Sequence, residues 1–336
     1  MRQLLLILLC LPFIGFGQNV NIPDANFKAV LVGNSTINTN GDSEIQVSEA
    51  TAFNGTIDCE SMNISNLTGI EAFTTLENLQ CGSNNLTSLD VTSNTSLIEL
   101  WCSYNQLTSL DVSNNTNLTR LSCASNQLTT LDVSANTALM YLFCTENQLT
   151  TLDVSQNTAL ENLECGSNNL TSLDVTSNTS LIELWCSYTQ LTSFDVSNNT
   201  NLTLLYCPYN QLTTLDVSAT TALTMLWCEE NNQLTSLDLR NGNNTNFHLM
   251  DAYDNPNLTC INVDDVAWST TNWTNIDSHH YFSNNCPPPT SIEEHTTNKE
   301  LLKVTDILGR EVNEKQNTPL FYIYNDGTVE KKIIIE

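Results

Sequence analysis

Apolar residues recur along the middle of the chain with a fixed spacing of 21 residues. Each unit follows the pattern L-x-x-L-x-C-x-x-N-x-L-T-x-L-D-V-S-x-N-T-x, with a cysteine at the third core position. In an extended segment of this unit, Leu100 and Cys102 share one face, whereas Glu99, Trp101 and Ser103 share the other. The pattern predicts one short strand per unit, with leucine and cysteine turned inward. The cysteines of the eight regular units are at positions 81, 102, 123, 144, 165, 186, 207 and 228.

No single unit can bury its own leucines, so the units must stack and share one continuous core. A looser unit around Cys59 precedes the eight regular ones, and another around Met250 follows them. We therefore expect a β-rich solenoid of about ten turns over residues 57–265, with a parallel sheet along its concave side. Parallel strands lie about 4.8 Å apart, which gives an array on the order of 45–50 Å long.

This repeat resembles the leucine-rich repeat, in its short 21-residue bacterial form with a cysteine in the core. Surface proteins of the internalin type carry similar cysteine-bearing repeats. The resemblance covers roughly residues 55–265 and rests on eight tandem copies of the core pattern. It implies the same stacked solenoid that the hydrophobic pattern predicts.

Aromatic residues interrupt the otherwise polar outer face of the predicted sheet. The residue before each ladder cysteine points out of the core, and in three successive units it is Trp185, Tyr206 and Trp227. A contiguous apolar patch usually marks an interaction site, and Trp and Tyr often dominate binding energy. The alternative is that the rings stack on one another and stiffen the sheet. The candidate ligand-binding residues are Trp101, Tyr104, Phe143, Trp185, Tyr188, Tyr206, Tyr209 and Trp227.

Part of the array was duplicated as a block of four units. Residues 81–121 and 165–205 are identical except at three pairs of positions. Trp101 and Trp185 are therefore copies of one residue and do not count as independent signals. The pairs that differ are Asn105/Thr189, Leu110/Phe194 and Arg120/Leu204.

Three polar or sulfur-bearing positions form ladders along the array. We expect the cysteines to be buried free thiols, because in-register Cβ atoms nearly 5 Å apart exceed the disulfide range and a straight row does not surround zinc tetrahedrally. The asparagine three residues later should turn the chain and bond backbone groups, and Thr189 interrupts that ladder. The aspartates form either a solvated, backbone-bonded row or a row bridged by calcium.

The first 17 residues have the features of a cleaved export signal. A basic start at Arg2 precedes an apolar stretch that is too short to span a bilayer, and small residues precede a cut before Gln18. The alternative is a lipoprotein acylated at Cys10. Either route predicts an extracellular or outer cell-surface protein in an oxidising compartment.

Residues 18–56 are expected to cap the first turn, with helical spacing over residues 24–31. The segment that follows resembles an EF-hand loop, and the resemblance implies a calcium site. The alternative is a plain Asn/Gly turn. The implied ligands are Asn38, Asn40 and Asp42 at loop positions 1, 3 and 5, Glu44 at position 7 through its carbonyl, and Glu49 at position 12.

Residues 266–286 are expected to close the array. Cys260 and Cys286 are the cysteines that remain after the export signal and the ladder are set aside, so a disulfide between them is the natural pairing. Trp268 and Trp273 should cover the last turn. Proline-rich residues 287–298 then form a stiff linker.

Residues 299–336 have the pattern of a small β module with a hairpin at Asn325-Asp326-Gly327. The sequence V-x-D-x-L-G-R-x-V, the F-Y-I-Y segment and the basic K-K-I-I-I end resemble the C-terminal sorting domain of the type IX secretion system of Bacteroidetes-type bacteria. The alternative is an ordinary short β appendage.

The charge distribution narrows the functional classes. The chain has 37 acidic and 10 basic residues, and Arg120 is the only basic residue between Lys28 and Arg240. Such a surface repels nucleic acid and anionic lipid. Histidine, the commonest acid–base catalyst, is absent from the repeats, so we do not expect an enzyme. We expect a monomer that binds a protein or polysaccharide at the cell surface, or else a passive, calcium-stabilised spacer.

Overall fold

The computed structural model describes residues 18–287, 301–306, 309–312, 319–324 and 329–333. They form two compact units, which divide between Cys286 and Pro287. The expected export signal and most of the expected linker lie outside the described residues. Among the described helices, none has the length and apolar composition needed to cross a lipid bilayer.

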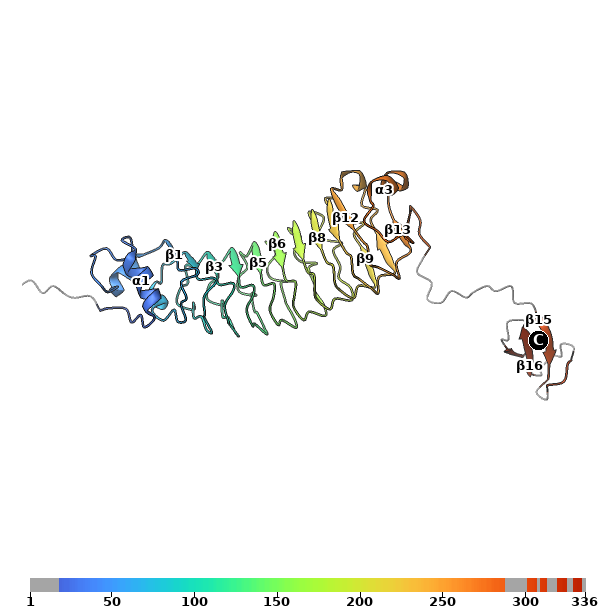
Figure 1. Cartoon of the computed structure of the whole chain (residues 1–336), viewed down its shortest axis with the longest axis horizontal. Helices are drawn as coiled ribbons and strands as arrows, with labels where there is room; N and C mark the ends of the chain where they lie inside the picture. Colours follow the sequence, from blue (N-terminus) through green and yellow to red (C-terminus); the bar gives the residue numbers. More distant parts are fainter. Residues whose placement is uncertain (1–17, 288–300, 307–308, 313–318, 325–328, 334–336) are drawn as a thin grey trace, which may run out of the picture. The chain divides into compact units, whose positions relative to one another are not determined.

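The first unit is a solenoid with a ten-stranded parallel sheet, one strand per turn (Figure 1). Each strand pairs in register with the next, so Leu100 lies beside Leu121 and Trp101 beside Ser122. A bridge between Asp251 and Asn275 adds an eleventh turn. The solenoid and its parallel sheet are confirmed. The strands are β1 (Thr56–Asp58), β2 (Asn78–Gln80), β3 (Glu99–Trp101), β4 (Arg120–Ser122), β5 (Tyr141–Phe143), β6 (Asn162–Glu164), β7 (Glu183–Trp185), β8 (Leu204–Tyr206), β10 (Met225–Trp227) and β12 (Leu249–Asp251).

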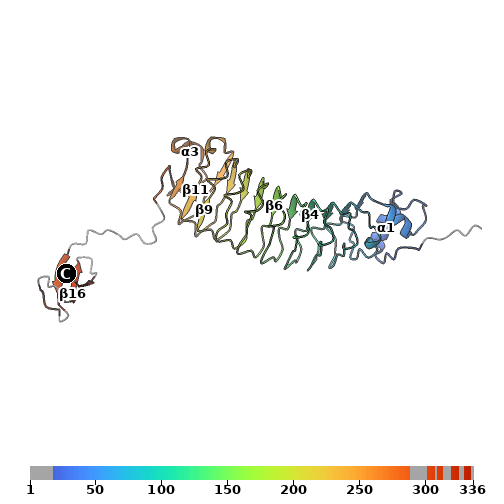
Figure 2. The ribbon, with the colours of Figure 1, turned by 180° about the vertical axis from the view of Figure 1, so that it is seen from behind.

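A second parallel sheet covers the other side of the last turns (Figure 2). Its strand order is β14-β13-β11-β9, and neighbouring strands again pair in register. Every turn therefore adds to one extended core rather than to a core of its own. The strands are β9 (Thr214–Asp216), β11 (Ser236–Asp238), β13 (Cys260–Asn262) and β14 (Tyr281–Ser283).

The cysteine ladder lies inside this core. All nine ladder cysteines, from Cys59 to Cys228, are free and buried, which confirms the expectation of buried thiols. Burial raises the pKa of Cys123 and Cys165 to about 12, so these thiols stay neutral and unreactive at physiological pH. The ladder therefore acts as a stack of small apolar side chains.

The asparagine ladder ties neighbouring turns together as the sequence predicts. Asn147 donates from Nδ2 to the carbonyls of Cys123 (3.0 Å), Cys144 (3.1 Å) and Thr145 (3.4 Å). Its Oδ1 accepts the backbone N–H of Leu128 at 2.9 Å. One buried side chain thus satisfies backbone groups in two turns.

A second asparagine ladder was missed in the sequence pattern. Asn157 is fully buried and donates to the carbonyls of Val133 (2.9 Å) and Asn136 (2.8 Å), both in the preceding turn. The side-chain oxygens of this ladder find no donor among the described residues. The members are Asn94, Asn115, Asn136, Asn157, Asn178 and Asn199.

Thr189→Asn is expected to raise the free energy of unfolding by about 1 kcal/mol. The Thr189 hydroxyl reaches Cys186 within its own turn and Asn210, whereas Asn105 in the duplicated copy also bonds the preceding turn. Urea denaturation measures the change, with the exposed Thr213→Asn as the matched control. A loss of stability would mean that the threonine turn is the better fit there.

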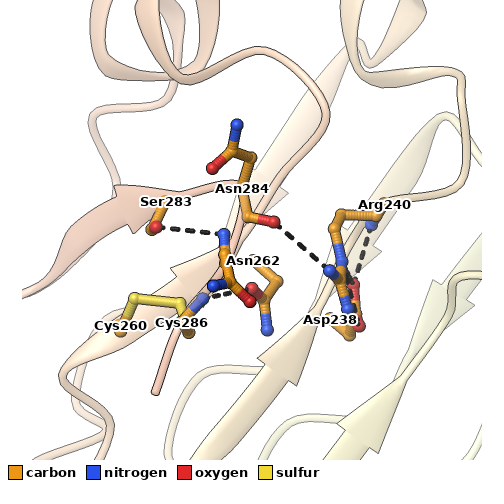
Figure 3. The surroundings of a disulfide bond; sticks show 8 residues. Asp238, Arg240, Cys260, Asn262, Ser283, Asn284 and Cys286 are labelled. Carbon is orange, nitrogen blue, oxygen red and sulfur yellow. Dashed lines mark hydrogen bonds and ion pairs between the residues drawn. A yellow bond between two sulfur atoms is a disulfide. The ribbon is translucent and has the colours of Figure 1, made fainter.

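Short helices and a disulfide close the two ends of the solenoid. Cys260 and Cys286 are bonded, with Cα atoms 5.8 Å apart, as predicted (Figure 3). Next to this bond, Asn262 accepts the backbone N–H of Cys286 at 2.8 Å. Trp273 is buried against Phe247 and Phe282. The helical segments are α1 (Ala25–Gly33), α2 (Val47–Ala52), η1 (Ile70–Ala72), η2 (Asn244–Asn246) and α3 (Val266–Asn272).

The second unit is a three-stranded antiparallel sheet in the order β15-β16-β17, so a C-terminal β module is present. In the L-G-R turn, Arg310 donates to the carboxylate of Asp306 at 2.8 Å. The resemblance of this module to a secretion sorting domain stays a prediction. The strands are β15 (Leu301–Thr305), β16 (Pro319–Tyr324) and β17 (Val329–Ile333).

Candidate functional site

Register places three aromatic side chains next to one another on the outer face of the main sheet. Trp185 pairs with Tyr206, and Tyr206 pairs with Trp227. The ring centroids of Trp185 and Tyr206 are 4.8 Å apart, and those of Tyr206 and Trp227 are 5.6 Å apart. The three rings are half-buried because they cover one another. Both parts of the sequence interpretation therefore hold: the rings face outward, and they also stack.

Two tyrosines extend this surface just beyond the strands. Tyr188 and Tyr209 have positive φ values of 51° and 55°, a left-handed conformation that turns the chain out of the strand. Their rings stack at 4.2 Å, and a hydrogen bond from Tyr188 raises the pKa of Tyr209 to about 12. Both rings are exposed. We call Trp185, Tyr188, Tyr206, Tyr209 and Trp227 the aromatic platform.

The earlier copy of the duplicated block forms a smaller aromatic cluster. Trp101 and Phe143 lie 6.4 Å apart across Ser122, whose small side chain leaves room between them. Tyr104, with 64% of its surface exposed, stands beside them. This arrangement leaves a hollow of about 390 Å³. It is lined by Trp101, Tyr104 and Phe143, by the small residues Gly82, Ser103, Ser122 and Ala124, and by the carboxylates of Glu60 and Glu164.

The predicted ligand-binding residues thus fall into two groups rather than one stripe. Trp101, Tyr104 and Phe143 surround the hollow, and the other five form the aromatic platform. Between the groups, β6 presents Glu164 where the neighbouring strands present Phe143 and Trp185.

Carboxylates around the rings were missed in the sequence interpretation. Glu183 accepts hydrogen bonds from Trp185 Nε1 at 3.4 Å and from Asn162 Nδ2 at 2.9 Å. Its counterpart Glu99 accepts from Trp101 Nε1 at 3.1 Å. A glutamate two residues before an outward tryptophan, on the same strand face, was the available signal.

The EF-hand-like loop is closed by its own hydrogen bonds. Asn38 Oδ1 accepts the backbone N–H of Gly41 at 3.0 Å, Asn40 Oδ1 accepts that of Asp42 at 2.8 Å, and Asp42 Oδ1 accepts that of Glu44 at 2.7 Å. The Glu44 side chain pairs with Lys28 at 2.7 Å. These oxygens have the chemistry that calcium prefers, but each already serves a donor.

Glu49, the expected bidentate ligand, has a structural role in this loop. One carboxylate oxygen accepts the N–H and hydroxyl of Thr39, and the other accepts the N–H of Gln46 at the start of α2. Burial alone would raise the pKa of Glu49, but the donors of Gln46 and Thr39 outweigh it and lower the pKa. Calcium binding here stays a prediction.

The aspartate ladder is a solvated, backbone-bonded row. Asp132 is exposed, and its Oδ1 accepts the backbone N–H of Ser134 at 2.9 Å. The hydroxyl and the N–H of Ser134 lower the pKa of Asp132, so the carboxylate stays ionised. Each such bond closes a tight turn within its own unit.

One histidine cluster lies in the C-terminal cap, where Asp277, His279 and His280 come together. The ring of His280 is buried, and burial lowers its pKa. Its Nδ1 accepts the backbone N–H of Asp277 at 3.2 Å, and its Nε2 lies 3.2 Å from the carbonyl of Asn255. Both ring nitrogens are engaged, so His280 anchors the last turns rather than offering a ligand atom.

Comparisons with known proteins agree with this architecture. The family described as leucine-rich repeats (two copies) matches residues 95–136. The chain is similar to the functional domain of InlJ from Listeria monocytogenes, which is described as including a cysteine ladder. The two are 32% identical with a TM-score of 0.54, and the match covers 73% of this chain and 66% of that one. The chain therefore spans just under two thirds of that domain.

Two further solved structures share the fold. A leucine-rich-repeat protein of Leptospira interrogans is 22% identical, with a TM-score of 0.53 over 66% of this chain and 63% of that one. Internalin C2 from Listeria monocytogenes is 16% identical, with a TM-score of 0.50 over 73% of this chain and 97% of that one. No curated protein sequence matches the chain.

Proposed function

Because the chain is an internalin-like leucine-rich-repeat protein, we propose that it is a non-catalytic binding protein that grips its ligand on the outer face of the ten-stranded sheet. The observation that carries this proposal is the aromatic platform, five aromatic side chains gathered on adjoining turns. Stacked tryptophan and tyrosine rings offer a large, rigid contact area at small entropic cost. Internalin-like repeats are generally associated with protein binding or adhesion.

We also propose that the protein acts outside the cell or on its outer surface. The bond between Cys260 and Cys286 suits an oxidising compartment. The basic, apolar start of the chain and the resemblance of its tail to a sorting domain agree with export. The ligand would then be another protein or a glycan at the cell surface, bound by a monomer.

An array of glycans and cell-surface proteins, probed with the full chain, tests this proposal. We expect saturable binding to a small set of ligands. Wild-type chain and a platform variant should be compared on the same array, so that adhesion through the acidic surface is separated from binding at the platform. Binding by both proteins to the same ligands would place the interaction elsewhere.

A second proposal is a passive spacer, and mutual stacking of the rings, such as Tyr188 on Tyr209, favours it. A calcium-stabilised spacer should gain about 5 °C or more in melting temperature when millimolar calcium is added. Glu49→Gln should abolish the gain, whereas the exposed Glu60→Gln should keep it. An unchanged melting temperature would remove calcium from the account, and ligand binding on the array would remove the spacer.

A further inference from the structure

A carboxylate without a cation stands in the middle of the ligand-binding face. Glu164 lies between Phe143 and Trp185 on adjacent strands and is half-buried. Among the described residues its side chain meets neither a hydrogen-bond donor nor a basic group. Burial and the nearby carboxylate of Glu183 both raise the pKa of Glu164. The two glutamates therefore form an uncompensated negative site at the edge of the aromatic platform.

The two copies of the duplicated block differ at the residue that could compensate this charge. In the first copy, Arg120 lies 3.9 Å from Glu99 and 4.4 Å above the ring of Tyr141. The equivalent residue in the second copy is Leu204. The first copy thus contains its own guanidinium, held by a carboxylate and an aromatic face, and the second copy retains the carboxylate and the rings without it.

The shape of the face admits such a group from outside. Glu164 also lines the hollow beside Trp101 and Phe143, so its carboxylate can be approached over an apolar floor. A lysine or arginine side chain suits this path because its stem is apolar and its head is charged. Across the platform, Glu229 is only 6% exposed and its Oε2 has no partner in the described chain, which makes a second uncompensated carboxylate.

We infer that the ligand is a protein that places a lysine or arginine side chain between Phe143 and Trp185, against Glu164 and Glu183. A cation there would pair with both carboxylates and lie against two aromatic rings, as Arg120 does within the chain. A neutral glycan would desolvate the same carboxylates further without neutralising them. This inference rests on the proposed function, because it names the chemistry of the ligand at the same face.

The test uses the full chain with ¹⁵N-labelled tryptophan and follows the indole signal of Trp185 by NMR. The probe is N-acetyl-arginine methylamide, and its citrulline analogue is the uncharged control. We expect a saturable shift with the arginine probe, in the millimolar range, and none with citrulline. Glu164→Gln should weaken this binding at least about tenfold, whereas Asp153→Asn, which removes an exposed charge, should not change it.

A second variant supplies the missing cation from within the chain. Leu204→Arg restores the residue of the first copy and should exclude the probe, also lowering affinity at least about tenfold. The inference falls if no shift occurs up to about 20 mM, if citrulline shifts the signal equally, or if both variants bind as the wild type does. The proposed function would survive each of these results if an array ligand still required the platform rings.

Discussion

Replacing Trp185, Tyr206 and Trp227 together with alanine is expected to abolish ligand binding, with a loss of affinity of about a thousandfold or more. The three rings lie on consecutive strands and cover one another, so the change removes the centre of the aromatic platform. Central Trp and Tyr residues commonly cost about 2 kcal/mol or more each when truncated. Biolayer interferometry with a ligand from the array measures the loss.

The same variant should remain folded. The rings lie outside the core, and the buried leucines beneath them, such as Leu184 and Leu226, are untouched. We expect a loss of less than about 3 kcal/mol in the free energy of unfolding, because stacked aromatic pairs contribute about 0.5–1.5 kcal/mol each. A triple alanine variant of Asp132, Asp153 and Asp174 is the matched control. Full affinity in the aromatic variant would contradict the proposed binding face.

Asn147→Ala is expected to destabilise the solenoid by about 3 kcal/mol. The change leaves three buried carbonyls and the N–H of Leu128 without their side-chain partner. Because each turn is stabilised by its neighbours, the loss should reduce cooperativity along the whole array. Equilibrium urea unfolding measures both the midpoint and the slope.

The control for this variant is Asp153→Ala, which removes an exposed residue whose carboxylate bonds the N–H of Ser155. We expect that change to cost about 1 kcal/mol or less. Equal losses in the two variants would show that the inter-turn bonds of the asparagine ladder are not a major source of stability.

The solenoid could be predicted from the sequence because one period determines everything that repeats. Cysteines 21 residues apart place every equivalent residue in register, so the inward and outward faces of one strand fix those of all strands. The pairing of Cys260 with Cys286 also followed, since the ladder accounted for the other cysteines of the repeats.

The turns between strands could not be predicted in the same way. Asn94 and its equivalents lie in segments that have neither the two-residue period of a strand nor the period of a helix. Nothing in one unit shows that this asparagine faces the core and bonds the preceding turn, as Asn115 bonds Val91 at 3.0 Å. Similarly, oxygen-rich spacing over residues 38–49 does not reveal that Glu49 caps α2.

The candidate site was predicted only in part for a related reason. Outward direction follows from alternation, so the rings were found, but their half-burial depends on neighbours in other turns. Whether a glutamate on that face is solvated or covered depends on the same neighbours. Glu164 and Glu229 are therefore recognisable as uncompensated carboxylates only in the folded array.

Hydroxyl-radical footprinting of the wild-type chain, with and without an array ligand, tests the central claim most directly. Trp, Tyr and Phe side chains oxidise readily where they are exposed, so the method reports each ring separately. The account predicts that the ligand protects Trp185, Tyr188, Tyr209 and Trp227, and leaves Trp268 in the cap unchanged. Unchanged oxidation of the platform rings in a saturated complex would contradict the claim that this face binds the ligand.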